Sequence, residues 1–181
     1  MIKPVLKNYI YATGMKSILN TKTEKIPERL IFKVLKKEAG EYIFIYRMAS
    51  KKGKYLGEMK ALPAFVQDES YYPNMKNYFS FYIKLLKAKV KNQKVGTDFL
   101  KLAKKESYRA NCDGKVHLFS VSPEIEAKSP PSIFYRKNGF SSKNISLLKA
   151  IDRRIKNKNV PLPSDCSQME MYLPVNLIKK K

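Results

Sequence analysis

The order of patterns between residues 77 and 121 limits the possible folds of this chain more than any other feature. NYFSFYIKLLKAKV (77–90) is a long aromatic and aliphatic run, which predicts a mostly buried strand. KNQKVG (91–96) follows as a short basic loop, and TDFLKLAKKESYRAN (97–111) has the period of an amphipathic helix. The expected buried face of that helix consists of Phe99, Leu100, Ala103, Ser107 and Ala110. KVHLFSV (115–121) predicts the next strand.

Upstream of this region the sequence predicts a β-hairpin. YIFIYRMA (42–49) is rich in strand-forming residues, SKKG (50–53) supplies a turn, and KYLGEMKALP (54–63) predicts a second strand that Pro63 stops. Residues 64–77 are expected to form a loop. LIFKVLKKE (30–38) fits either a helix or a strand, and the strand is slightly favoured because the next segment could pair with it across Ala39 and Gly40.

Downstream, the sequence predicts two more helices and a closing strand. SPPSIFYRKNGF (129–140) has Ser129 as a cap, Pro130 for the first helical position and Gly139 as a stop. A short helix is expected around ISLLKAIDRRI (145–155), and MEMYLPV (169–175) is expected to be a strand. This order of elements is typical of an α/β or α+β fold with a mixed sheet. We expect a single domain over residues 1–181 with a core of about 41–175, and residues 1–40 are the least readable.

The charge of the chain is unusual. Thirty-seven basic residues and fifteen acidic ones give a formal net charge of +22. Such a surface attracts phosphates, so nucleic acid, CoA, an anionic membrane or an acidic protein are all admissible partners. The alternative is a coding bias, because only six of the basic residues are Arg and the chain is rich in Ile, Asn and Tyr.

The composition disfavours a disulfide framework, a metal site, a membrane span and a signal peptide. Cys112 and Cys166 are too few for a disulfide framework, and His117 lies outside any metal-binding motif. No run of eighteen apolar residues is present, and the first residues lack the apolar stretch of a signal peptide. We therefore expect a cytoplasmic protein without a membrane span or a metal centre.

The loop before the predicted helix at 97–111 is a candidate phosphate site. The first N–H groups of a helix lack internal partners and carry about half a positive charge. Lys91 and Lys94 add positive charge beside them. The alternative interpretation is a solvated turn whose lysines face water.

Two segments together resemble the GNAT superfamily of acyl-CoA-dependent N-acyltransferases. KNQKVGTDFLKLA (91–103) resembles its Arg/Gln-x-x-Gly-x-Gly/Ala motif, although Lys91 replaces the Arg or Gln and Lys94 replaces the first glycine. IFYRKNGF (133–140) resembles the later Phe-Tyr-x-x-x-Gly-Phe motif. The resemblance covers residues 41 to about 140 and a last strand. It implies a mixed, mostly antiparallel central sheet with helices on both faces.

The resemblance also implies a mechanism in which an amine attacks acetyl-CoA, or another acyl-CoA, directly. Tyr135 would be the general acid, and Glu58 is the nearest candidate for the base. His117 is more consistent with a core residue than with a catalyst. The strand before the loop would hold the pantetheine arm, and the loop would hold the pyrophosphate. The implied cofactor-binding residues are Leu85, Leu86, Lys87, Lys91, Asn92, Gln93, Lys94, Val95, Gly96 and Thr97.

The acceptor and the rival function stay open at this point. Acceptors consistent with the charge are a small amine, an acidic protein segment or an aminoacyl-tRNA, which some members of the superfamily acylate. The basic tract from Arg136 to Lys158 would suit a tRNA backbone. The rival is a basic nucleic-acid-binding or ribosome-associated module without enzymatic activity. The sequence does not specify an oligomeric state.

Overall fold

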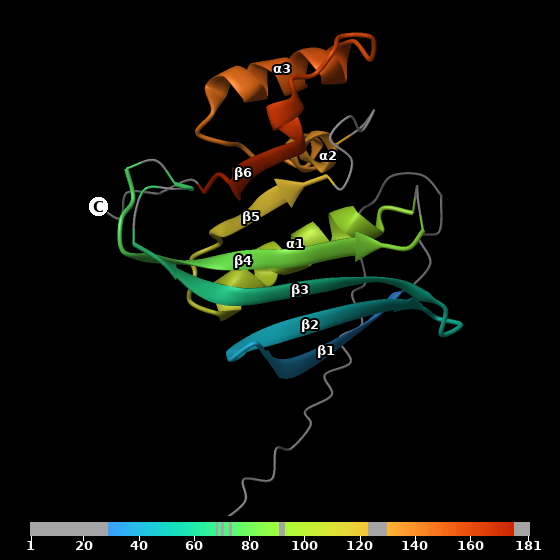
Figure 1. Ribbon diagram of the computed structural model, residues 1–181. Helices are drawn as coiled ribbons and strands as arrows, with labels where there is room; N and C mark the ends of the chain where they lie inside the picture. The colour runs from blue at the N-terminus through green and yellow to red at the C-terminus, as the bar shows by residue number, and fades with distance from the viewer. Residues whose placement is uncertain are drawn as a thin grey trace, which may run out of the picture. The chain divides into compact units, whose positions relative to one another are not determined.

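The structure is a computed structural model, and it describes residues 29–67, 69, 71–72, 74–90, 93–122 and 130–175. These residues form six strands, three α-helices and one short 3₁₀ turn, which Figure 1 shows in chain order. The elements are β1 (Arg29–Glu38), β2 (Glu41–Ser50), β3 (Tyr55–Val66), β4 (Tyr78–Ala88), α1 (Val95–Arg109), β5 (Val116–Val121), α2 (Pro131–Lys137), α3 (Ile145–Lys156), η1 (Ser164–Ser167) and β6 (Gln168–Leu173).

The strands belong to one mixed sheet, so the chain is an α+β protein. Their order in the sheet is β1-β2-β3-β4-β5-β6. β1 and β2 are antiparallel, as are β2 and β3 and also β5 and β6, whereas β4 and β5 run parallel. The parallel pair is connected through α1, as a crossover between parallel strands requires. The predicted fold class and mixed sheet are confirmed.

The ambiguous segment before residue 39 is a strand. β1 pairs with β2 along its whole length, from Arg29 opposite Ser50 to Glu38 opposite Glu41. The connection is a two-residue turn in which Ala39 has φ 49° and Gly40 has φ 87°. Two positive φ values in succession define the turn type whose twist matches that of the flanking strands. The preference for strand at this segment is therefore confirmed.

Two details of the predicted boundaries are wrong. β3 does not stop at Pro63 but continues to Val66. A proline has a φ compatible with a strand and lacks only the N–H donor. The pairing of β3 with β2 ends at Ala61, so Pro63 lies beyond the stretch in which β2 would need that donor.

The start of α2 is also different from the prediction. Pro130 is the N-cap, with φ −62° and ψ 154°, and Pro131 is the first helical residue. Ser129, the predicted cap, lies outside the described residues. The predicted stop is confirmed, because Gly139 has φ 89° and the N–H of Phe140 reaches back to the carbonyl of Tyr135 at 3.1 Å.

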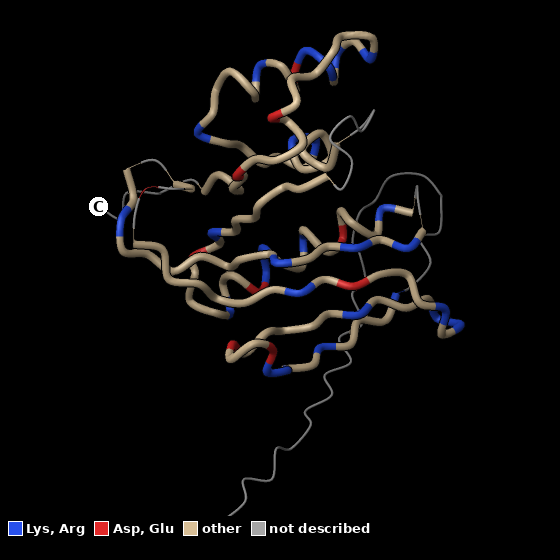
Figure 2. The backbone as a smooth tube through the Cα atoms, viewed as in Figure 1, with Lys and Arg blue, Asp and Glu red and all other residues tan. Residues whose placement is uncertain are grey.

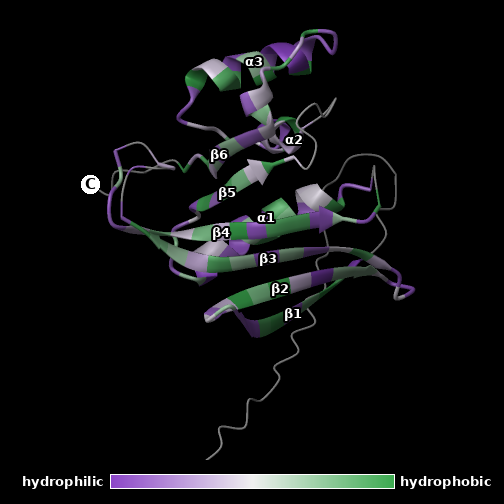
Figure 3. Cartoon of the chain, viewed as in Figure 1, coloured by the Kyte–Doolittle hydropathy of each residue, from purple (hydrophilic) through white to green (hydrophobic). Residues whose placement is uncertain are grey.

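The chain forms two compact units, and β3, β4 and α1 each contribute residues to both. The first unit contains the described residues up to Leu62 together with Leu85–Phe99. Its buried apolar side chains come from β1, β2, β3 and the first turns of α1: Ile31, Ile43, Ile45, Tyr46, Met48, Leu56, Met59, Ala61, Val95 and Phe99. Figure 3 shows that apolar and polar residues are interspersed along these strands.

The second unit contains residues 63–84 and the described residues from Leu100 onward. α2 contacts β5, β6, η1 and α3, so the two helices and the end of the sheet share one apolar core. Tyr72 joins β5 to β6: its hydroxyl accepts from the N–H of Val116 at 2.8 Å and lies 2.8 Å from the carbonyl of Leu173. Burial raises the pKa of Tyr72, so the hydroxyl stays protonated and can serve as donor and acceptor at once.

Candidate functional site

The residue just before α1 has a left-handed backbone conformation, which glycine adopts more readily than other residues. Lys94 occupies that position with φ 56°. Its carbonyl accepts the first helical hydrogen bond, from the N–H of Asp98 at 2.9 Å. A side chain in this region of φ costs roughly 1–2 kcal/mol. A glycine at position 94 would adopt the same backbone conformation without this cost.

Arg29, at the start of β1, anchors this loop within the first unit. Its guanidinium donates to the backbone carbonyl of Gln93 and to the carboxylate of Asp98 in the first turn of α1. The Arg29 side chain is 8% exposed. One guanidinium group thus holds the loop from both sides of Lys94 and brings a buried positive charge to the helix N-terminus.

The end of β4 lies very close to β3 in the same unit. An ideal Cβ added to Gly57 would meet the carbonyl oxygen of Lys87 at 2.5 Å and Val95 Cγ1 at 3.1 Å. The N–H of Lys89 donates to the carbonyl of Leu56 at 2.9 Å. Only a glycine at position 57 allows this approach, so β3 supports both the end of β4 and the first residue of α1.

β4 and β5 are paired over only part of their length. Their parallel register joins Phe81–Ile83 to Val116–Leu118, and both strands continue beyond it, β4 to Ala88 and β5 to Val121. Leu85, just past the paired part, is 40% exposed although it is a large apolar residue.

The implied cofactor-binding residues therefore have different environments. Leu85 and Lys87 are exposed and Leu86 is half-buried on β4. Gln93 and Lys94 are exposed in the loop, Val95 and Gly96 are buried, and Thr97 is half-buried in the first turn of α1. Lys91 and Asn92 lie outside the described residues. Leu85–Lys87 and Gln93–Thr97 belong to the same compact unit.

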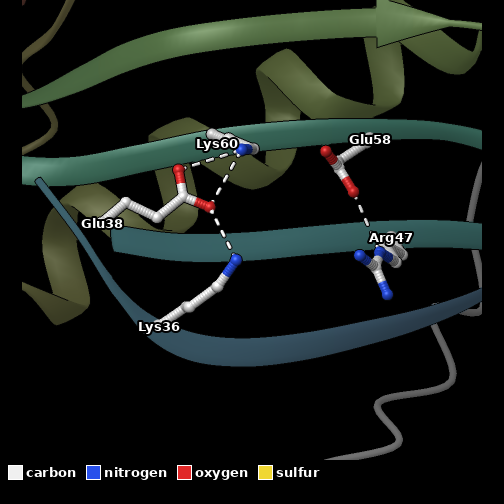
Figure 4. Close-up of polar contacts among 5 residues, drawn as sticks. All are labelled: Lys36, Glu38, Arg47, Glu58 and Lys60. Atoms are coloured by element: carbon white, nitrogen blue, oxygen red, sulfur yellow. Dashed lines mark hydrogen bonds and ion pairs between the residues drawn. The ribbon is translucent and has the colours of Figure 1, made fainter. Parts of the chain in front are cut away.

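Glu58, the candidate base, is engaged with Arg47. The two residues are cross-strand partners on β3 and β2, and Arg47 Nε donates to Glu58 Oε2 at 2.9 Å. The Glu58 side chain is 17% exposed. Side chains alternate along a strand, so Glu58 lies on the face of the sheet opposite to its neighbour Gly57. Figure 4 shows this pair beside the Lys36–Glu38–Lys60 ion pairs on the same face.

The ion pair limits what Glu58 can do. To accept a proton from an amine at Oε2, Glu58 would have to give up its hydrogen bond from Arg47, whose side chain is 59% exposed. The role of Glu58 as a base stays a prediction.

Tyr135, the predicted general acid, belongs to α2 in the second unit and is 8% exposed. Its ring packs against Phe134 and Phe140, with centroid distances of 5.3 and 5.6 Å. Burial raises the pKa of Tyr135 to about 12. The phenol therefore keeps its proton throughout the neutral range, and its role as an acid stays a prediction.

His117 is a core residue of the second unit. Its imidazole lies against Tyr71 and Tyr82, with ring centroids 4.1 and 4.9 Å away, and is 3% exposed. Within the described part of the chain Nδ1 has no hydrogen-bond partner. Burial lowers the pKa of His117 to about 4. The predicted core position is confirmed, but the hydrogen bond expected of a core histidine is absent from these residues.

Two residues that shape the candidate site have only weak signals in the sequence. Gly57 occurs in a predicted strand, where a glycine suggests close backbone approach. Arg29 carries only the weak signal of being one of six Arg in a Lys-rich chain.

The candidate site is thus the loop at the N-terminus of α1, which the buried side chain of Arg29 anchors. It lies next to the end of β4, which continues beyond the stretch that pairs with β5. The chain matches no protein-family model, no curated protein and no solved structure. Among the described residues no group of His, Cys, Asp or Glu could hold a metal ion. None of the described helices has the length and apolarity needed to cross a membrane.

Proposed function

We propose that the protein is an acyl-CoA-dependent N-acyltransferase with a GNAT-like fold, and that it transfers an acetyl or other acyl group to an amine in the cytoplasm. The observation that carries the proposal is the backbone of Lys94, which has the left-handed conformation at the position of the motif's first glycine. The parallel β4–α1–β5 crossover and the order of the strands support it.

The loop would bind the pyrophosphate of CoA through its backbone. The N–H groups of Val95, Gly96 and Thr97 open α1 and lack partners inside the helix. A phosphate there gains from the helix dipole and from the exposed ammonium group of Lys94. Arg29 neutralises Asp98, which would otherwise repel the ligand from the first turn.

The pantetheine arm would lie along β4 after its paired stretch. Backbone N–H and C=O groups of a strand need partners, and an extended amide-containing ligand can supply them in the manner of an added strand. Leu85 and Leu86 would contact the arm, and a backbone N–H at this level would stabilise the oxyanion formed when the amine attacks the thioester.

Tyr135 enters the proposal through its place in the motif from Phe134 to Phe140. A phenol of pKa about 12 is a weaker acid than a thiol, whose ordinary pKa is about 8.5. Tyr135 would therefore stabilise the departing thiolate by donating a hydrogen bond and not by complete proton transfer. The amine would lose its proton to Glu58, after its release from Arg47, or to water.

Binding of acetyl-CoA tests the proposal directly. We expect acetyl-CoA to raise the melting temperature and pantetheine, which lacks the phosphates, to have little effect. Lys94→Glu should weaken acetyl-CoA binding, measured by calorimetry, by about tenfold or more, because it reverses a charge next to the pyrophosphate. Lys104→Glu is the matched control on the exposed side of α1 and should change affinity by less than about twofold. Equal effects of the two variants, or no binding at all, would refute the loop assignment.

Acyl transfer is tested separately with a panel of primary amines and detection of the released thiol. Tyr135→Phe should lower kcat while the Kd for acetyl-CoA stays unchanged. A protein that binds acetyl-CoA but releases no thiol with any amine would be a cofactor-binding protein without transferase activity. If acetyl-CoA leaves the melting temperature unchanged and RNA raises it, the result would favour the rival function, a nucleic-acid-binding module without enzymatic activity.

A further inference from the structure

The outer side of α3 carries a row of cations. Lys149, Arg153 and Lys156 are all exposed, and their spacing of four and then three residues places them on one side of the helix. The helical rise separates successive members by about 6 and 4.5 Å along the axis. Lys143 and Lys158, both exposed, extend the row beyond the two ends of the helix. Figure 2 shows basic residues (blue) along α3 and in the segments on either side of it. We call these five residues the α3 basic face.

The opposite side of α3 packs into the core of the second unit. Leu147, Leu148, Ala150 and Ile151 are buried, and α3 contacts α2 and η1. In Figure 3 the helix alternates between hydrophobic and hydrophilic residues accordingly. The apolar side is therefore not available to enter a bilayer, which is how an amphipathic helix binds a membrane surface.

The positive charge of this face is not compensated locally. Asp152 is the only acidic residue on α3, and its two carboxylate oxygens accept from Arg136 at 2.8 and 2.7 Å. The hydrogen bonds from Arg136 hold the pKa of Asp152 below its ordinary value, so Asp152 stays ionised and bound to Arg136. Within the described ranges, no member of the α3 basic face forms an ion pair with a carboxylate, although Lys156 lies near enough to influence Asp152.

We infer that the α3 basic face binds the phosphodiester backbone of a nucleic acid. A row of cations a few ångströms apart fits a ligand whose charges repeat at a similar interval along a strand. The side-chain amides of exposed Asn157 and Asn159, next to the row, can donate to phosphate oxygens, whereas the hydroxyl of Ser146 already donates to Asn144 Oδ1 at 2.7 Å. These contacts reach the phosphates and not the base edges, so binding should depend on charge and not on the nucleotide sequence. The inference does not rest on acyl-CoA binding, because every residue that carries it lies on or beside α2 and α3.

The test uses the full-length protein without acyl-CoA and two fluorescent probes, a 20-nucleotide single-stranded RNA and a 20-base-pair DNA duplex. The variant Lys149→Gln/Arg153→Gln/Lys156→Gln removes three charges from α3 with little change in helix propensity. Lys101→Gln/Lys104→Gln/Lys105→Gln removes three charges from the exposed side of α1 and is the matched control. The two variants have the same net charge, so a difference between them reports the location of the binding surface.

We expect the α3 variant to bind more weakly by roughly 10- to 100-fold at low salt, with the slope of log K against log salt reduced by about 2 to 3. The α1 variant should stay within about threefold of the wild type. Lys149→Arg/Lys156→Arg, which keeps the charge, should bind like the wild type. Comparison of the RNA and DNA probes shows which backbone is preferred.

Several results would overturn the inference. Equal losses in the α3 and α1 variants would mean that binding follows net charge alone. Displacement of the probes by poly-glutamate at equal charge concentration would indicate an acidic protein as the partner. Stronger binding to vesicles containing phosphatidylserine than to either probe would indicate a membrane surface. Failure of the wild type to bind either probe at low salt would also refute it. Melting temperatures of all variants establish that each one is folded.

Discussion

Replacement of Gly57 by alanine tests the closest packing in the candidate site. The new Cβ would lie 2.5 Å from the carbonyl oxygen of Lys87, 3.1 Å from Val95 Cγ1 and 3.2 Å from Ala88 Cα, whereas ordinary contacts begin near 3.4 Å. Two of these three atoms belong to the backbone of β4, which cannot turn away as a flexible side chain could. β4 or the start of α1 must therefore shift.

The magnitude follows from two opposing terms. Inserting a methyl group into a packed region costs about 1–3 kcal/mol. Alanine also reduces the conformational entropy of the unfolded chain, which stabilises the folded state by about 0.4–1 kcal/mol. We expect a net loss of about 1–2 kcal/mol in the free energy of unfolding. For a chain of this size that corresponds to a fall in melting temperature of roughly 2–8 °C.

Urea unfolding and acetyl-CoA calorimetry together form the assay. Gly53→Ala is the control, because Gly53 has φ 76° and its added Cβ would meet nothing within 4 Å. The control should lose stability through its backbone alone, by about 1 kcal/mol, and keep its affinity for acetyl-CoA. Gly57→Ala should lose both stability and affinity for acetyl-CoA. If Gly57→Ala keeps the stability and affinity of the wild type, the close approach of β3 to β4 does not constrain the loop.

Three further results are expected. Arg29→Met should lower the free energy of unfolding by about 1–3 kcal/mol in urea, because it leaves Gln93 and Asp98 without their donor; a change below about 0.5 kcal/mol would contradict the anchoring role. Lys94→Gly should be more stable than Lys94→Ala by about 1 kcal/mol in the same assay, because both remove the charge and only glycine accepts the positive φ; the reverse order would be inconsistent with the φ of 56°. The pKa of His117 is about 4 in the folded state and about 6.5 when unfolded, so the unfolded chain binds the proton first as pH falls. Stability should therefore fall between pH 6.5 and 4 by about 3 kcal/mol more in the wild type than in His117→Gln, and parallel pH profiles would exclude a buried neutral imidazole.

The secondary structure could be predicted largely from local patterns. The period of the apolar residues identified β2, β3, β4, α1 and β5, and their boundaries are within a few residues of those observed. Four of the five residues expected on the buried face of α1, Phe99, Leu100, Ala103 and Ser107, are buried. Ala110, the fifth, lies just beyond the end of the helix and is half-buried. A periodic pattern records which side of an element faces the core, and that information is contained in neighbouring residues.

The wrong prediction for the end of β3 has a tertiary cause. Pro63 is compatible with an extended backbone, and it ends a strand only where a neighbouring strand requires its N–H. β2 pairs with β3 only as far as Ala61, so no residue of β2 needs a hydrogen bond from the backbone N–H at position 63. The pairing of β2 and β3 is a property of two segments, so the residue itself could not indicate whether the strand would continue.

The sequence by itself determined the succession of strands and helices, the basic loop before α1 and the positive charge of α3. Only the tertiary structure decided that Arg29 anchors a loop more than sixty residues away, that Gly57 lets β3 support the end of β4, and that Arg47 engages Glu58. The physical reason is that periodicity and turn chemistry act between near neighbours in the chain. Ion pairs and close backbone contacts depend on which segments the folded sheet brings together.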